Sequence, residues 1–370
     1  MINKKNKLTV LQILPELDSG GVERGTLEVG KFLTINGHKS LVISGGGRMR
    51  KDLVKEGSKH FQWPIGKKSL FTFKYVPILA RFILKNKVDI LHARSRLPAW
   101  ICFLALKIIP IQKRPKFITT FHGPYSVNSY SGIMTKGDKV IVISKTIKKY
   151  VLKNYKLNPQ KVFLNYRGVD SKKFPYLFKP KKIWIKDWYK NYPETKDKIL
   201  LTMPGRITRW KGQEDFIEII AKLRKKTPNI IGLIVGDVKS NKKNFLNELK
   251  VKVGQLGVEK NILFIEHRSD LREIMAMSKI VFSLSKEPEA FGRTTIEALK
   301  LGIPVIGYNH GGVGEQLKEI FPQGKIDRKN IGQAVLLASK WIMDPPEVIY
   351  SELFSLNKML ENTLKVYESI

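Results

Sequence analysis

The chain has 370 residues, long enough for two domain cores, and its 42% hydrophobic and 10% aromatic residues exclude a disordered or low-complexity protein. Lysine and arginine outnumber aspartate and glutamate by 67 to 32, and the net charge of +35 predicts attraction to anionic lipid, phosphate-rich substrates or nucleic acid. A zinc-finger spacing, a long basic block and an aromatic RNA-binding signature are all lacking, so we expect no nucleic-acid partner. A general preference for lysine would explain part of the excess.

The cysteine content and the hydropathy pattern predict a cytoplasmic protein. The single cysteine, Cys102, lies in an apolar run and indicates a buried, inert thiol in a reducing compartment. The first seven residues are basic and polar rather than a secretory signal. The longest apolar run, 97–111, is interrupted by Lys107 and Pro110 and is too short to span a bilayer.

The first half of the chain alternates short apolar strands with helical patterns. A helix is expected at about 21–36. The strands expected in this half are 8–14, 39–44, 90–93, 116–121 and 139–143. Such alternation predicts a parallel, doubly wound sheet with helices on both faces.

The alternation stops between residues 170 and 198, in a stretch rich in lysine, proline and aromatic residues, and then resumes. The strands expected after it are 199–203, 230–235, 262–264, 280–284 and 304–308. The helices expected there are 213–225, 244–256, 271–277 and 294–301. We therefore predict an α/β protein with two Rossmann-like doubly wound domains, 1–175 and 199–347, joined by a linker at 176–198. Two such halves in tandem place a ligand cleft where their strand ends face each other.

The most specific motif is E-P-E-A-F-G-R-T-T-I-E, in which seven residues separate Glu289 from Glu297. Gly292 allows a ligand to approach the backbone closely, and the amides from Gly292 to Thr295 lie at a predicted helix N-terminus, which suits a phosphate. Glu289 is then placed to hold sugar hydroxyls and Glu297 to bind a ribose. Either glutamate alone would be an ordinary surface charge, but the whole string favours a binding site.

A second motif, P-G-R-I-T-R-W-K-G at 204–212, directly follows a predicted strand. Arg206 and Lys211 therefore stand at the strand's carboxyl end, where doubly wound sheets bind ligands. A guanidinium binds phosphate oxygens in bidentate fashion and an ammonium acts as a point charge, so the pair suits a departing nucleoside diphosphate.

Two weaker signals lie in the first half. Gly20 and Gly21 follow the first strand and open a helix, which suits a close ligand approach or an ordinary tight turn. His122 ends another strand, where it would bond a substrate sugar or pack as a loop histidine.

In this order, the motifs resemble the retaining GT-B glycosyltransferases of family 4, in particular bacterial enzymes that build lipopolysaccharide core or related surface glycans. The match includes R-G-V-D at 167–170 and G-G-V-G-E at 311–315, and it covers nearly the whole chain. The resemblance implies a C-terminal helix, about 348–370, that packs back on the first domain. It implies no metal and no cofactor, and a donor linked to UDP, GDP or ADP; the sequence contains no Asp-x-Asp motif and no His/Cys cluster with metal-ligand spacing.

The resemblance also implies a role for each site residue. Arg206 and Lys211 would bind the donor diphosphate, Glu289 the donor sugar, Glu297 the ribose, and His122 would lie near the transferred sugar. The remaining donor-binding residues that it implies are Gly20, Gly21, Gly205, Phe291, Gly292, Arg293 and Thr294.

Retention of configuration is implied by the resemblance alone. In the expected mechanism, Arg206, Lys211 and the amides near Thr294 stabilise charge on the leaving phosphate, and a donor phosphate oxygen is the base. Two other enzyme classes, a sugar-nucleotide epimerase and a phosphorylase, are disfavoured by the two-glutamate motif and by the lack of a pyridoxal phosphate signature. A basic lipid- or nucleic-acid-binding protein with a degenerate GT-B cleft is the alternative from another class.

The acceptor is expected to be a lipid-linked or other surface glycan, reached from the inner face of the cell membrane. The segment 67–87 combines lysines and arginine with Phe71, Phe73 and Phe82, which suits a peripheral helix on anionic lipid. An ordinary helix packed on the sheet has the same pattern. The aromatic and lysine-rich segment 176–198 suits either a lipid interface or packing at the domain seam.

Overall fold

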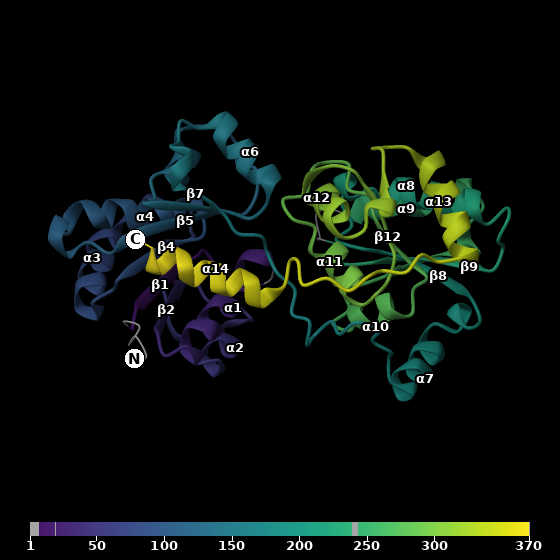
Figure 1. Ribbon diagram of the computed structural model, residues 1–370, viewed down its shortest axis with the longest axis horizontal. Coiled ribbons are helices and arrows are strands. Elements are labelled where there is room, and N and C mark those ends of the chain that lie inside the picture. The colour runs from purple at the N-terminus through teal and green to yellow at the C-terminus, as the bar shows by residue number, and fades with distance from the viewer. Residues whose placement is uncertain (1–6, 19, 239–242, 370) are drawn as a thin grey trace. The chain divides into compact units, whose positions relative to one another are not determined.

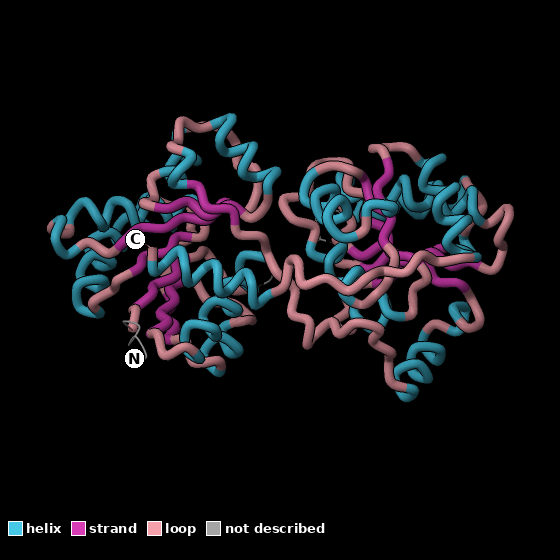
Figure 2. The backbone as a smooth tube through the Cα atoms, in the orientation of Figure 1, coloured by secondary structure: helices cyan, strands magenta, loops and turns pink. Residues whose placement is uncertain are grey.

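The computed structural model describes residues 7–18, 20–238 and 243–369. The chain divides into two compact units, one of residues 1–166 with 357–370 and one of residues 167–356. Each unit contains one parallel sheet flanked by helices (Figure 1), and the tube view separates these layers by colour (Figure 2). The predicted α/β fold with two Rossmann-like units is therefore confirmed.

The first unit holds a seven-stranded sheet in the order β3-β2-β1-β4-β5-β6-β7. Its strands are β1 (Thr9–Ile13), β2 (Lys39–Ser44), β3 (Lys59–Gln62), β4 (Ile90–Ala93), β5 (Lys116–Phe121), β6 (Lys139–Val142) and β7 (Val162–Leu164). The central strands are buried at almost every position because helices cover both faces, and this explains why they are mostly apolar. The strand order reverses between β1 and β4, so the carboxyl ends of these strands lie at the switch point where doubly wound sheets bind ligands.

Helices connect the parallel strands of this sheet. They are α1 (Gly21–Ile35), α2 (Arg50–Lys55), α3 (Tyr75–Asn86), α4 (Arg96–Ile108), α5 (Ser129–Gly132) and α6 (Lys145–Asn154), with 3-10 turns at Leu70–Lys74, Ile111–Lys113, Ile133–Thr135 and Pro159–Lys161. Cys102 is fully buried on α4, and burial raises the pKa of its thiol. Within the described residues, no helix combines the length and the apolar character needed to cross a bilayer.

The last helix, α14 (Leu356–Glu368), lies against the first unit (Figure 1). Asn165, just after β7, donates a hydrogen bond of 2.9 Å to Thr363 Oγ1, and Tyr367 Oη lies 2.7 Å from His92 Nδ1. Tyr367 is completely buried, and burial raises its pKa to about 12. The segment 348–355, expected to belong to this terminal helix, is instead part of the second unit.

The second unit holds a six-stranded sheet in the order β10-β9-β8-β11-β12-β13. Its strands are β8 (Ile199–Pro204), β9 (Ile230–Val235), β10 (Ile262–Ile265), β11 (Ile280–Ser283), β12 (Val305–Tyr308) and β13 (Lys325–Ile326). Its helices are α7 (Lys182–Asn191), α8 (Gln213–Leu223), α9 (Lys243–Gln255), α10 (Leu271–Ala276), α11 (Arg293–Lys300), α12 (Gly311–Ile320) and α13 (Ile331–Met343), with 3-10 turns at Pro193–Thr195, Arg209–Lys211, Glu259–Asn261 and Pro322–Gly324. The order reverses between β8 and β11, which places the switch point of this sheet there.

The segment 176–198 belongs to the second unit instead of forming a linker, and the first unit ends at residue 166 rather than 175. Its helix α7 buries Trp188 against Leu200 of β8 and Ile231 of β9. Trp184 and Trp188, four residues apart, stack with ring centroids 5.4 Å apart on the face of the helix that meets the sheet. The aromatic residues are therefore core residues of this unit.

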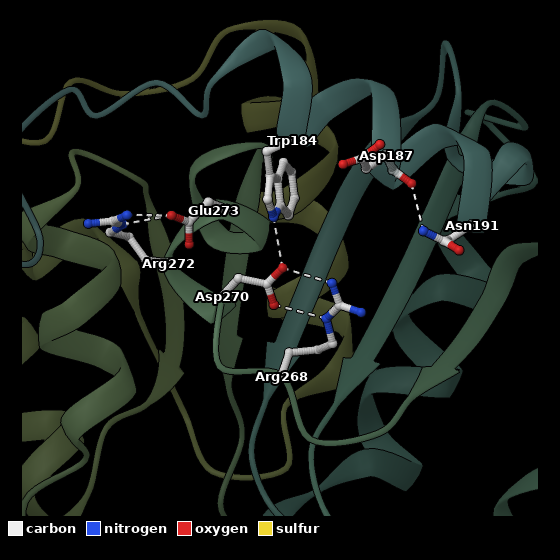
Figure 3. Close-up of polar contacts among 7 residues, drawn as sticks. All are labelled: Trp184, Asp187, Asn191, Arg268, Asp270, Arg272 and Glu273. Carbon is white, nitrogen blue, oxygen red and sulfur yellow. Dashed lines mark hydrogen bonds and ion pairs between the residues drawn. The ribbon is translucent and has the colours of Figure 1, made fainter.

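Polar contacts fix the same helix at the end of β10 (Figure 3). Trp184 Nε1 donates a 2.8 Å hydrogen bond to Asp270 Oδ2, and Arg268 binds both oxygens of that carboxylate at 2.9 and 2.7 Å. Burial alone would raise the pKa of Asp270, but the bonds from Arg268 and Trp184 outweigh burial and hold the pKa below its usual range. The charged carboxylate thus fastens α7 to the unit.

Candidate functional site

Three loops of the second unit meet at the carboxyl ends of the neighbouring strands β8, β11 and β12. They comprise residues 205–212, 284–292 and 309–310, the last of which leads into α12. The amide of Lys286 donates to the Trp210 carbonyl at 2.6 Å, and the amide of Gly312 donates to the Glu289 carbonyl at 2.7 Å. These backbone bonds join the two sequence-predicted motifs into one site at the switch point.

Glycines make this convergence possible. Gly212 has a φ of 87°, and a Cβ there would lie 2.0 Å from the Leu284 carbonyl oxygen. Gly292 has a φ of 83° and precedes α11, and a Cβ there would lie 2.6 Å from Val313 Cγ2. A larger residue at either position would force the loops apart, since both the left-handed backbone and the close contact exclude a side chain.

Lys211 and Glu289 form an ion pair at the centre of the site. The distance from Lys211 Nζ to Glu289 Oε1 is 2.7 Å, and the side chains are only 16% and 14% exposed. Ser285 Oγ donates a second hydrogen bond to the same carboxylate oxygen. The bonds recorded for this carboxylate within the described part of the chain all go to Oε1, so Oε2 retains its capacity to accept.

Glu297 is buried on the first turns of α11 and accepts a 2.8 Å hydrogen bond from Arg293 Nε, four residues earlier. Gly292 precedes the helix without a side-chain cap, so the amides of the first turn are not occupied by a capping group. Thr294 lies half-buried in that turn. The N-terminus of α11 therefore combines backbone amides without a side-chain cap, a cation and a buried carboxylate within two helical turns.

A network of polar and charged side chains connects the β11 loop to α8 and β12. Lys286 Nζ donates to Glu214 at 2.5 Å and lies 3.4 Å from Asp215, and Tyr308 of β12 donates to Asp215 at 2.5 Å. Burial lowers the pKa of Lys286, but the two carboxylates outweigh burial and raise it above its usual value. Burial and the neighbouring Asp215 likewise raise the pKa of Tyr308. This network fixes the direction of the β11 loop.

The structure brings together most of the predicted residues of the second half, with one exception. Gly205 donates its amide to the Val235 carbonyl at 2.9 Å, and Phe291 is buried against Phe354 with centroids 5.9 Å apart. Arg206 follows Gly205, but its guanidinium is exposed, and among the described residues no ion pair or hydrogen bond of that side chain is recorded. Its backbone carbonyl accepts a bond from Gln213 Nε2 instead.

The predicted residues of the first half lie in the other unit, at the carboxyl edge of its sheet. Gly20 precedes α1 with a φ of 145°, and Gly21 begins that helix with open space where a Cβ would stand. His122 follows β5 and is half-buried. Ser19, part of the same predicted loop as the glycines, lies outside the described residues.

Several site residues were not predicted from the sequence. Ser285 donates a hydrogen bond to Glu289. The two residues are four positions apart in a loop and not in a helix, so the sequence did not indicate that they meet. Gln316 Oε1 and Thr295 Oγ1 are buried, have no hydrogen-bond partner among the described residues and lie close to Gly292, whereas the prediction for Thr295 concerned its backbone amide alone. The described residues contain no group of three or more histidine, cysteine, aspartate or glutamate side chains arranged to hold a metal ion.

Two glycosyltransferase domains match the chain in tandem. Residues 19–173 match glycosyltransferase family 4, and residues 185–363 match glycosyl transferases group 1. Together these matches cover both units and all the predicted motifs.

Individual relatives agree with the domain matches. A glycosyltransferase of Rickettsia africae ESF-5 is 33% identical, with a TM-score of 0.84 and 98% of each chain covered. HepE of Anabaena, solved in complex with UDP and glucose, has a TM-score of 0.82 at 18% identity, over 98% of this chain and 100% of its own. The N-acetyl-alpha-D-glucosaminyl L-malate synthase of Bacillus anthracis is 26% identical over 82% of this chain and 79% of its own. With its two domain matches and a full-length relative above 30% identity, the chain belongs to the GT-B glycosyltransferases, with a family 4 domain followed by a group 1 domain.

Proposed function

We propose that the enzyme transfers a sugar from a nucleotide-sugar donor to a lipopolysaccharide-core or related surface-glycan acceptor, with retention of configuration, at the inner face of the cell membrane. The observation that carries the donor part of this proposal is the Lys211–Glu289 pair beside the uncapped N-terminus of α11. A cation, a carboxylate with an available oxygen and a row of amide donors are the groups that a sugar diphosphate requires.

The diphosphate of the donor would lie against the first turn of α11. The amides of Gly292 to Thr294 point along the helix axis and carry the positive end of its dipole. Lys211 Nζ, which forms an ion pair with Glu289, would contact the phosphate oxygens as well. The exposed side chain of Arg206 would reorient to bind the same phosphates. These groups stabilise the charge that develops on the leaving diphosphate, which is the main catalytic demand of the reaction.

The two glutamates would bind the two sugars of the donor. Glu289 Oε2 would accept from hydroxyls of the transferred sugar, while Ser285 and Lys211 hold Oε1. Glu297 would accept from the ribose hydroxyls and share its carboxylate with Arg293. His122, in the first unit, would lie near the transferred sugar, and Gly20 and Gly21 near the phosphates.

The base for the acceptor hydroxyl would be a phosphate oxygen of the donor itself. Glu289 has one oxygen held by Lys211 and Ser285, so it is better suited to orienting a sugar than to removing a proton. The reaction is proposed to need no metal and no cofactor, because Lys211, Arg206 and the α11 amides supply the positive charge. UDP-sugars are the first donors to test, because HepE was solved with UDP and glucose.

Membrane contact is proposed for the turn before α3. Leu70 and Phe71 are 86% and 83% exposed and lie among Lys67, Lys68 and Lys74. Exposed apolar groups amid lysines suit the interface of an anionic bilayer. The third phenylalanine of the predicted amphipathic segment, Phe82, packs internally on Phe61 with centroids 4.7 Å apart, so the proposed contact is shorter than the sequence indicated.

Vesicle sedimentation tests the membrane part of the proposal. The protein is expected to bind vesicles of anionic phospholipid and not vesicles of zwitterionic phospholipid, with binding weakened by salt and by the double substitution Leu70→Ser, Phe71→Ser. Equal binding to anionic and zwitterionic vesicles would contradict the proposed membrane contact.

A coupled assay of nucleoside diphosphate release tests the enzymatic part. The purified protein is incubated with UDP-, GDP- or ADP-sugars and delipidated or intact surface glycan, with chelator present. Lys211→Ala and Arg206→Ala are expected to lower turnover by about 100-fold or more. The exposed Arg206 should be removable without an appreciable change in melting temperature, whereas Lys211→Ala should also lower it, because Glu289 loses its buried partner. Unchanged turnover in both variants would remove these residues from the mechanism.

A further inference from the structure

The carboxyl edge of the first sheet carries a cationic and aromatic cluster for which the donor chemistry has no use. Arg96 is the first residue of α4 and follows β4 by three positions. Its guanidinium lies over the rings of Tyr125 and Tyr130, at 4.9 and 5.4 Å from their centroids, and Nη1 donates to Ser131 Oγ at 3.2 Å. We call these four residues the Arg96 cluster.

Within the described part of the chain, the guanidinium of Arg96 contacts one hydroxyl and two aromatic rings and interacts electrostatically with Tyr155, and none of these partners is a carboxylate. A guanidinium carries five N–H donors, so most of its hydrogen-bonding capacity is available. Arg96 also opens the 13-residue helix α4, whose N-cap residue, Ser95, makes no side-chain capping bond. The positive end of the helix therefore adds to the charge of the side chain.

Arg94, two residues earlier, provides an internal contrast. It is fully buried, donates from Nε to Gln12 Oε1 at 2.8 Å, and lies close enough to Tyr367 and Glu28 to interact with their charges. Arg94 thus satisfies its charge inside the fold, as structural arginines do. Arg96 is only half-buried, and its contacts in the described part of the chain are uncharged groups, the Ser131 hydroxyl and aromatic rings.

The loop that surrounds Arg96 is held in place by other aromatic side chains. Trp100 Nε1 donates to the Tyr130 carbonyl at 2.9 Å. Tyr150 donates to the Tyr125 carbonyl, and Tyr155 to the Ser126 carbonyl at 3.3 Å. A loop fixed in this way loses little entropy when a ligand binds, so the cluster has the rigidity of a binding site.

We propose that the Arg96 cluster binds an oxyanion of the acceptor, a phosphate or a carboxylate group on the glycan that receives the sugar. The planar guanidinium matches either group in bidentate fashion, and the half-exposed Tyr130 offers a ring on which a sugar can stack. The other three residues of the cluster lie on the segment that follows His122 and includes α5, and His122 is the residue proposed to lie near the transferred sugar. This inference rests on the proposed function, because it assigns the acceptor to the first unit.

Calorimetric titration with three monosaccharide probes tests the inference. Glucose 6-phosphate, glucuronate and glucose are titrated into the full-length protein in the presence of saturating UDP, which occupies the phosphate-binding groups of the donor site. We expect at least one anionic probe to bind more tightly than glucose. We also expect Arg96→Gln to lower the affinity for that probe by about tenfold or more. The probe whose affinity falls in Arg96→Gln tells whether the acceptor carries a phosphate or a carboxylate.

Matched variants separate this site from the donor site. Lys211→Met is expected to lose UDP binding but to keep the anion preference, whereas Arg96→Gln keeps UDP binding. If Arg96→Gln lowers the melting temperature, Arg96→Met, which preserves the aliphatic stem, replaces it. Anionic probes that bind no better than glucose, or that bind both Arg96 variants as tightly as the wild type, would overturn the inference. Loss of the preference in Lys211→Met would overturn it too. If UDP does not bind the wild type, GDP or ADP takes its place in the titration, and a failure of all three nucleotides to bind would contradict the proposed function instead.

Discussion

Lys211 Nζ and Glu289 Oε1 lie 2.7 Å apart, although the two residues are 78 positions apart in the chain, and the hydroxyl of Ser285 donates to the same oxygen. The pair joins the β8 loop to the β11 loop. Since both side chains are mostly buried, the removal of one charge leaves the other poorly compensated. This pair should therefore affect both stability and donor chemistry.

Glu289→Gln tests that double role. The free energy of unfolding of the variant is expected to be lower by about 1–3 kcal/mol, because the Lys211 ammonium loses its charged partner. The variant is also expected to lose about 100-fold or more in kcat/KM. Urea unfolding and donor turnover are the measurements, and Glu287→Gln is the matched control, because Glu287 is exposed and its ion pair in the described part of the chain is a long one, to Arg328 at 3.5 Å. Equal effects of the two substitutions would contradict the role of Glu289.

The Arg293–Glu297 pair predicts how the nucleotide is recognised. If Glu297 binds the ribose hydroxyls, the wild type should bind UDP about tenfold more tightly than 2′-deoxy-UDP. Glu297→Gln should lower the affinity for UDP and reduce the discrimination between the two nucleotides. Competition titrations with both nucleotides against both proteins complete the cycle. Discrimination that survives in Glu297→Gln would place the ribose elsewhere.

The depressed pKa of Asp270 predicts an acid-dependent weakening of the second unit. A carboxyl group whose folded pKa lies below its unfolded value, about 3.9, stabilises the fold above that value, and the contribution is lost as the pH falls through the folded pKa. Asp270→Asn should therefore be less stable than the wild type near neutral pH, and the difference should shrink in strong acid.

Denaturant unfolding followed by tryptophan fluorescence measures this difference, because Trp184 donates to Asp270 and stacks on Trp188. Asp187→Asn is the control, since Asp187 lies on the same helix but is exposed. A stability gap for Asp270→Asn that stays constant from neutral pH to strong acid would show that the charge is unimportant.

The last helix should be needed for the stability of the first unit. Tyr367 is fully buried and its hydroxyl lies 2.7 Å from His92 Nδ1, so Tyr367→Phe removes this buried hydrogen bond. The expected loss in the free energy of unfolding is about 1–3 kcal/mol. Tyr350→Phe, at an exposed tyrosine, should change stability by less than about 0.5 kcal/mol. Comparable losses in the two variants would mean that the buried hydrogen bond contributes little.

The central strands of both sheets could be predicted from the sequence because each is a short apolar run buried on two faces. β2, β4, β5 and β9 have the predicted bounds. The edge strands β3, β7 and β13 were not predicted, since they are two to four residues long and their pattern is weak. Their pairing depends on a neighbouring strand that is already in place.

Long-range partners explain the other differences. Helix α7 was predicted as a linker because lysines interleave its tryptophans, and the residue that fixes it, Asp270, lies 86 positions from Trp184. The two donor motifs could be predicted from local spacing, whereas their contact through Lys211 and Glu289 could not. The same holds for Arg96, whose aromatic neighbours come from a loop about 30 residues away.

The direct test of a nucleotide-sugar donor site in the second unit is a calorimetric titration of UDP-, GDP- and ADP-sugars into the wild type, with Lys211→Met and Glu297→Gln in parallel. We predict that donors of one nucleotide bind without added metal, and that each substitution weakens binding by about tenfold or more. Binding that is the same in all three proteins, or absent for every nucleotide, would contradict the donor site described above.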